Sequence, residues 1–202
     1  MKRWAIGTAV IVLALFISAN QTAGQGGTPM DFVRAMLDRV LEIQNDPALQ
    51  QSKDVRRSLI RELIVKSFDL EEMARDSLGQ ERWNSLSKEQ RSEFRTVFQG
   101  LFLDSYSRLV LDFLKKEKID YGKSDVREGK TIVRTSILRL DDRIPVEYVL
   151  TDLNAGFLIS DVIIDGVSIV QNYRTSFSQV IKKESFSGLL KRMRLQQKAG
   201  NQ

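Results

Sequence analysis

The sequence predicts an α+β protein in which helices cover one face of an antiparallel sheet. Apolar residues at helical spacing dominate the chain up to about residue 116, whereas alternating and short β-branched runs dominate from there to residue 164. Helices clustered before strands are typical of α+β folds, since helices and strands alternate in parallel α/β sheets. The 202 residues contain no internal repeat, and their number suits one domain preceded by a leader.

The first residues have the pattern of a secretory signal peptide. Lys2 and Arg3 precede an apolar run from Trp4 to Ile17, and small residues follow it. The run is shorter than the ~20 residues of a membrane span, although an uncleaved signal anchor is the alternative. We therefore expect a signal peptide at 1–23, a flexible lead-in at 24–29, one folded domain at 30–197 and a tail at 198–202.

Capping residues and helix breakers delimit the first two expected helices. Thr28, Pro29 and Asp31 favour a helix start, and Asp46-Pro47 ends that helix. A second helix is expected near residues 54–66. The apolar residues expected to face inward on it are Val55, Leu59, Leu63 and Ile64.

Two further helix starts follow. Asp69 with Glu72 predicts a reciprocal cap, and Gly79 ends that short helix. Ser87 and Gln90 repeat the capping signal, and a long helix should follow to about residue 116. Its apolar stripe is wide and rich in aromatic residues, so we expect two surfaces of the molecule to share it. The stripe consists of Phe94, Val97, Phe98, Leu101, Phe102, Ser105, Tyr106, Leu109, Val110 and Phe113.

The strands are expected in the second half. Residues 131–140 and 144–151 predict a hairpin about Asp141-Asp142, and shorter strands are expected at 119–121 and 125–127.

The stretch from Phe157 to Phe177 combines three signals. The β-branched run to Ile164 predicts a buried strand, and Asp165-Gly166 predicts a tight turn. Apolar residues at helical spacing then predict an amphipathic helix, which a terminal helix near 187–195 follows.

The available side chains argue against most enzyme classes. The chain has no histidine and no cysteine, which removes the commonest general base, the commonest metal ligand and the thiol nucleophile. It also excludes disulfides and a lipid-modified cysteine. Asp161 is a carboxylate in an apolar strand, for which a helix cap or an Arg partner is the ordinary role and a shifted catalytic pKa the alternative. We expect a non-enzyme without a metal or another cofactor.

The net charge does not favour a nucleic-acid partner. Loss of Lys2 and Arg3 with the leader would lower the formal charge from +5 to +3. The basic excess gathers near the end of the chain, where it either complements the dipoles of the last helices or contacts an anionic surface.

Two segments resemble the MlaC family, also called the toluene-tolerance family, of periplasmic phospholipid-binding proteins. The first contains Phe68, Asp69, Met73, Ala74, Leu78, Gly79, Trp83, Ser87, Gln90, Arg91, Phe94, Phe98 and Tyr106. The second contains Val146, Tyr148, Gly156, Asp161, Gly166, Val167, Ser168, Asn172, Tyr173, Arg174 and Phe177. The match covers roughly residues 30 to 195, with Phe157 where the family usually has Trp and Val149 where it frequently has Arg.

The resemblance implies a curved antiparallel sheet wrapped by helices, with an apolar cavity that holds acyl chains. It implies a soluble periplasmic carrier that exchanges phospholipid between an outer-membrane lipoprotein complex and an inner-membrane ABC transporter bearing an MCE protein. A carrier of hopanoid or another apolar lipid, and a non-binding scaffold of the envelope, are the alternatives. A carboxylate-dependent enzyme acting on lipids is a more distant one.

Eight residues are expected to line this cavity, although each of them would also suit an ordinary solid core. They are Phe98, Phe102, Tyr106, Val133, Val146, Tyr148, Ile164 and Tyr173. For Tyr173 and Arg174, a clamp at the helix start, for example with Asp161, competes with contact to a headgroup or partner.

Overall fold

The described residues of the computed structural model, 27–154 and 156–199, form seven α-helices and a five-stranded antiparallel sheet. The helices are α1 Pro29–Asn45, α2 Lys53–Ser67, α3 Leu70–Leu78, α4 Gln80–Ser85, α5 Lys88–Phe113, α6 Ile169–Glu184 and α7 Phe186–Ala199, with a 3₁₀ turn at Pro47–Leu49. The strands are β1 Lys118–Arg127, β2 Lys130–Leu138, β3 Arg143–Leu153, β4 Gly156–Ile164 and β5 Val167–Ser168. The predicted α+β fold is confirmed, while the predicted signal peptide lies outside the described residues.

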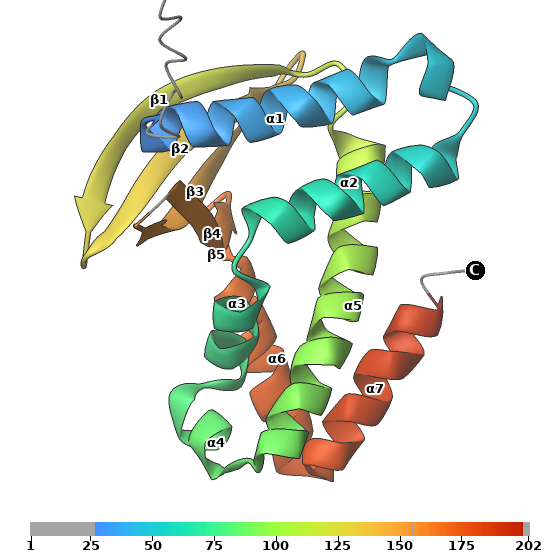
Figure 1. Cartoon of the computed structure of the whole chain (residues 1–202), viewed down its shortest axis with the longest axis vertical. Helices are drawn as coiled ribbons and strands as arrows, with labels where there is room; N and C mark the ends of the chain where they lie inside the picture. The colour runs from blue at the N-terminus through green and yellow to red at the C-terminus, as the bar shows by residue number, and fades with distance from the viewer. Residues whose placement is uncertain (1–26, 155, 200–202) are drawn as a thin grey trace, which may run out of the picture.

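The sheet is a meander in the order β1-β2-β3-β4-β5, and it curves around α1 (Figure 1). The two short strands expected at 119–121 and 125–127 are one strand, β1, whose pairing with β2 shifts between Tyr121 and Ser124. Such a bulge bends a strand and increases its twist, which explains why the sequence pattern breaks there. The curvature gives the sheet a concave face that α1 can cover.

The predicted helix caps are confirmed at two of three places. Thr28 and Ser87 each form a complete capping box at the starts of α1 and α5. At α3, the side chain of Asp69 accepts a hydrogen bond from the backbone N–H of Glu72, as expected. The reciprocal half is wrong, because the carboxylate of Glu72 binds residues of the sheet instead.

The expected inward face of α2 needs a correction. Ile60 and Ile64 are buried, whereas Val55 is 47% exposed. Five residues of helix turn a side chain by about 140° from the position that it follows, so Val55 and Ile60 point to different sides. The long helix α5 ends at Phe113, three residues before the expected end, and α7 continues to Ala199 into the expected tail.

Helix α5 joins two regions of the molecule (Figure 1). Its first half lies among α3, α6 and α7, and its second half reaches α1, α2 and the sheet. Within the described residues, no helix has the combination of length and hydropathy that crossing a membrane requires.

Candidate functional site

A cavity of about 250 Å³ lies between the concave face of the sheet and the helices that cover it. Helix α1 contributes Met36, Leu37 and Val40, α2 contributes Ile60, Leu63 and Ile64, and α5 contributes Phe102, Tyr106, Leu109, Val110 and Phe113. The sheet contributes Ile137, Ile144, Val146, Tyr148, Val162 and Ile164. Phe68, Leu114, Arg139 and Ile169 complete the lining.

The interior of this cavity is uncharged. Burial raises the pKa of the Tyr106 phenol far above its ordinary value, and the neighbouring Tyr173, to which its hydroxyl is hydrogen-bonded, raises it further. Burial likewise raises the pKa of Tyr148. Both phenols therefore stay neutral over the physiological pH range, and the rest of the inner lining is hydrocarbon. Such a surface suits an apolar guest and offers almost no partner to water.

The structure brings five of the eight sequence-predicted residues together on the cavity wall and places three outside it. On the wall are Phe102, Tyr106, Val146, Tyr148 and Ile164. Phe98 points instead into a packed aromatic cluster, with its ring centroid 5.4 Å from that of Tyr173. Tyr173 stands behind Tyr106, and Val133 is fully buried beside the wall.

Sequence reasoning missed the contribution of α1 and α2 and the residues at the mouth. Spacing alone marks the α1 residues as inward-facing, but it does not say whether they meet other side chains or a void. The sequence contains no separate signal for Phe113, because it continues the apolar stripe of α5 and its 54% exposure follows only from the structure.

Arg139 and Phe113 line the cavity and are both partly exposed to solvent, and we call this part of the lining the mouth. The Nη2 of Arg139 donates a hydrogen bond of 2.8 Å to the backbone carbonyl of Phe113 and lies 3.5 Å from a carboxylate oxygen of Glu117. The Cζ of Arg139 stands 5.5 Å from the centroid of the Phe113 ring. Arg139 thus connects the β2–β3 hairpin to the end of α5.

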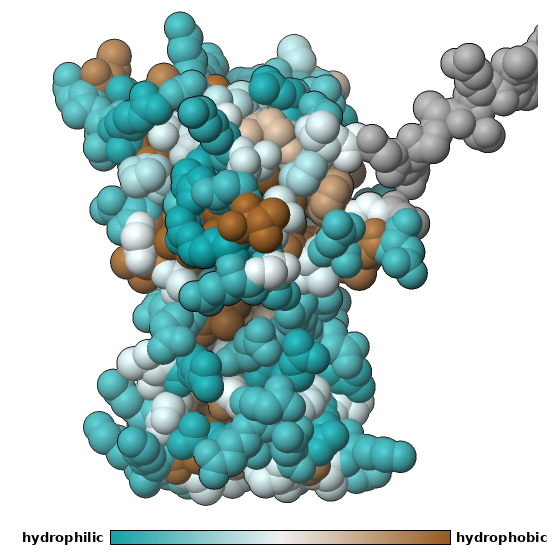
Figure 2. Space-filling model, turned by 90° about the vertical axis from the view of Figure 1, so that its left-hand side faces the viewer, coloured by the Kyte–Doolittle hydropathy of each residue, from teal (hydrophilic) through white to brown (hydrophobic). Residues whose placement is uncertain are grey.

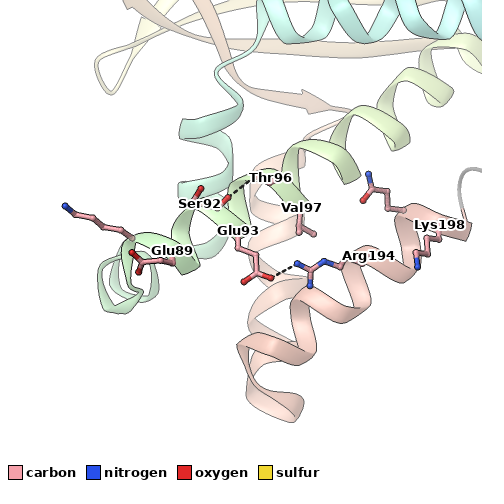
Figure 3. A pocket seen from close by; sticks show the side chains of 9 residues that line it. Glu89, Ser92, Glu93, Thr96, Val97, Arg194 and Lys198 are labelled. Atoms are coloured by element: carbon pink, nitrogen blue, oxygen red, sulfur yellow. Dashed lines mark hydrogen bonds and ion pairs between the residues drawn. The ribbon is translucent and has the colours of Figure 1, made fainter.

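A second hollow, of about 870 Å³, lies on the surface between α5 and α7 (Figure 3). Its lining carries both charge signs, and Figure 3 shows Glu93 paired with Arg194 across it. Although it is larger, this hollow is a solvated polar groove, and burying hydrocarbon against such groups would leave them desolvated. We therefore take the smaller apolar cavity as the candidate site.

The face in Figure 2 is mostly hydrophilic, and apolar surface shows at the waist between the upper and lower parts of the molecule. The upper part contains the sheet with α1 and α2, and the lower part contains the helices around the first half of α5 (Figure 1). The apolar cavity belongs to the upper part.

Asp161 has the structural role expected of it. It accepts hydrogen bonds from the backbone N–H groups of Val162 at 2.8 Å and Val170 at 3.1 Å, and from the Ser168 hydroxyl at 2.5 Å. Burial raises the pKa of Asp161 in spite of these bonds. The carboxylate therefore anchors the start of α6, which confirms a helix cap rather than a pairing with Arg174.

The part of the chain that the structure describes contains no set of side chains that could bind a metal ion. There, no group of three or more Asp, Glu, His or Cys side chains gathers closely enough to hold an ion.

Comparisons with known proteins agree with this geometry. The chain superposes with a TM-score of 0.74 on a solved phospholipid-binding protein from Ralstonia solanacearum in complex with a phospholipid, at 19% sequence identity. The match covers 86% of this chain and 98% of the other, so the two share a fold. None of the curated proteins compared with the chain matches it. The family model described as MlaC protein matches residues 34–195. The chain therefore belongs to the MlaC family.

Proposed function

We propose that this protein binds a phospholipid, with its acyl chains in the cavity under the sheet and its headgroup at the mouth. The observation that carries the proposal is a hydrocarbon cavity in whose lining, among the described residues, Arg139 is the single charged residue and is partly exposed to solvent. The fold shared with the Ralstonia phospholipid-binding protein supports it.

Hydrocarbon burial explains why such a carrier is needed. Each methylene kept from water contributes ~0.8 kcal/mol. Two acyl chains with about 30 methylenes together represent on the order of 20 kcal/mol. A lipid cannot cross an aqueous compartment at that cost, whereas exchange between a membrane and a matching apolar cavity is nearly balanced.

The size of the cavity bears on how much of a lipid it can take up in this conformation. A volume of about 250 Å³ is below the ~300–1,000 Å³ of ordinary ligand sites. In the proposal, α1 and α2 separate from the sheet to admit two full acyl chains.

The finer role rests on the family alone. In the proposal, the protein is periplasmic, acts as a carrier rather than as an enzyme, and exchanges phospholipid between an outer-membrane lipoprotein complex and an inner-membrane ABC transporter bearing an MCE protein. The transporter, rather than this chain, would supply any energy from ATP.

The test is lipid recovery and uptake by a pair of adjacent variants. The purified protein should yield a stoichiometric phospholipid by mass spectrometry of a denatured extract. Ile164→Trp, on the cavity wall, should lower lipid uptake from liposomes at least about tenfold, because the indole fills the space that the acyl chains need. Ile163→Trp is the matched control, since neighbouring strand residues point to opposite faces.

Absence of both bound lipid and uptake in the unaltered protein would refute the proposal. An apolar molecule of another mass, such as a hopanoid, would replace phospholipid as the cargo. Equal lipid uptake by Ile164→Trp and Ile163→Trp would show that the lipid binds somewhere other than in this cavity.

A further inference from the structure

Among the residues that the structure describes, Arg139 is the one charged residue in the lining of the apolar cavity. It follows β2 directly, and its side chain is 36% exposed, so the guanidinium meets both the mouth and water. The charged guanidinium of Arg139 cannot contribute to the binding of hydrocarbon. It can act only on a part of the guest that stays at the rim.

The contacts of Arg139 leave donors for such a guest. A guanidinium has five N–H donors. Both polar contacts that the structure gives the guanidinium of Arg139, to the Phe113 carbonyl and to Glu117, use Nη2. The N–H groups on Nε and Nη1 have no partner among the described residues, so they can bind an anion without breaking the link to α5.

The neighbouring acidic group does not cancel this charge completely. The carboxylate of Glu117 also accepts hydrogen bonds from the backbone N–H groups of Lys115 at 2.5 Å and Lys116 at 3.0 Å. Its negative charge is therefore shared between the turn after α5 and Arg139. Arg143, at the start of β3, is paired with Asp120 and does not line the cavity.

We propose that Arg139 binds the phosphodiester of the lipid and makes the cavity select phospholipids over neutral lipids with the same acyl chains. The inference rests on the proposed function, because acyl chains in the cavity would place the phosphate at the mouth. Arginine suits this role, since its planar fork binds two phosphate oxygens at once.

The experiment compares two lipids that differ only in the headgroup. Uptake of phosphatidylglycerol and of diacylglycerol with identical acyl chains is measured for the unaltered protein, Arg139→Gln and Arg139→Lys. Arg139→Gln should weaken phosphatidylglycerol binding about tenfold and leave diacylglycerol binding within about twofold. Arg139→Lys should give an intermediate loss, because it keeps the charge without the fork. Arg143→Gln, on the other side of the hairpin, should bind both lipids as the unaltered protein does.

The outcomes separate this inference from the proposed function. If Arg139→Gln binds both lipids as the unaltered protein does, or binds both equally more weakly, Arg139 does not bind the phosphodiester. Glycerol 3-phosphate at millimolar concentration should not displace phosphatidylglycerol, and displacement would show a site for soluble phosphate instead. Failure of the unaltered protein to bind either lipid would refute the carrier function itself.

Discussion

The two halves of helix α5 use the same residue types for opposite purposes. In the first half, Phe94 and Phe98 are fully buried in a solid cluster with aromatic rings of α4, α6 and α7. In the second half, Phe102 and Tyr106 face the cavity beneath the sheet. The lower part of the molecule in Figure 1 is thus a filled core, and the upper part is a hollow one.

The difference lies in what faces the helix. The rings of Phe94, Phe98 and Phe177 pack at centroid distances of 5.9 to 6.4 Å, because α5 and α6 bring aromatic side chains to one place. The second half of α5 faces a curved sheet whose branched aliphatic residues do not reach across the gap. A filled region can hold the fold together while a neighbouring region keeps a void for a guest.

The sharpest test of this comparison truncates two phenylalanines one turn apart. Phe98→Ala should lower the free energy of unfolding by about 3–5 kcal/mol, because it removes a ring packed on several sides. Phe102→Ala should cost less, since one side of that ring already faces the cavity. Urea unfolding of both variants measures the difference.

Lipid uptake by the same two variants provides a second measurement. Phe102→Ala enlarges the cavity, so lipid uptake should persist. Equal destabilisation by the two variants would mean that the void contributes no difference in packing, and the distinction between filled and hollow halves would fail.

The next prediction concerns the joint between the two regions. Glu72 on α3 accepts hydrogen bonds of 2.7 Å from Lys130 Nζ and from the Thr151 hydroxyl, both on the sheet. Burial alone would raise the pKa of Glu72, but these two bonds together with the positive charges of Lys130 and Arg75 hold the pKa below its ordinary value of 4.5. The carboxylate therefore stabilises the fold above that pH, and this stability is lost as the pH falls through the lower, folded-state pKa.

Glu72→Gln should cost about 1–3 kcal/mol at pH 7, because hydrogen bonds to a charged group are replaced by weaker ones. The difference between variant and unaltered protein should shrink as the pH falls below 4.5. Chemical unfolding from pH 7 down to pH 3 gives this curve. A difference that stays constant with pH would show that the charge of Glu72 does not join the two regions.

Local signals in the sequence were enough to predict most of the fold. The capping pairs at Thr28 and Ser87 and the Asp165-Gly166 turn depend only on neighbouring residues, and the structure has all of them. The exceptions have tertiary causes. Glu72 binds the sheet because Lys130 and Thr151 are brought to it by the fold, which no spacing along the chain reveals.

The cavity wall was harder to predict for a related reason. Phe98 and Phe102 lie on the same stripe, and a void and a solid core are built from the same side chains. What separates them is the shape of the opposing surface, which depends on the curvature of a sheet far away in sequence. Arg139 was missed because an arginine after a strand carries no local sign of the cavity beside it.

The smallest expected effect belongs to the rim. Phe113 continues the stripe of α5, but the residue is 54% exposed and the Arg139 guanidinium lies over its ring. Phe113→Ala should lower the free energy of unfolding by less than about 1 kcal/mol, the range of an exposed cation–π contact. The hydrogen bond from Arg139 should persist, because its acceptor is the backbone carbonyl. The same urea series measures it, and a loss as large as that of Phe98→Ala would place this ring in a packed core and leave the cavity without the mouth described here.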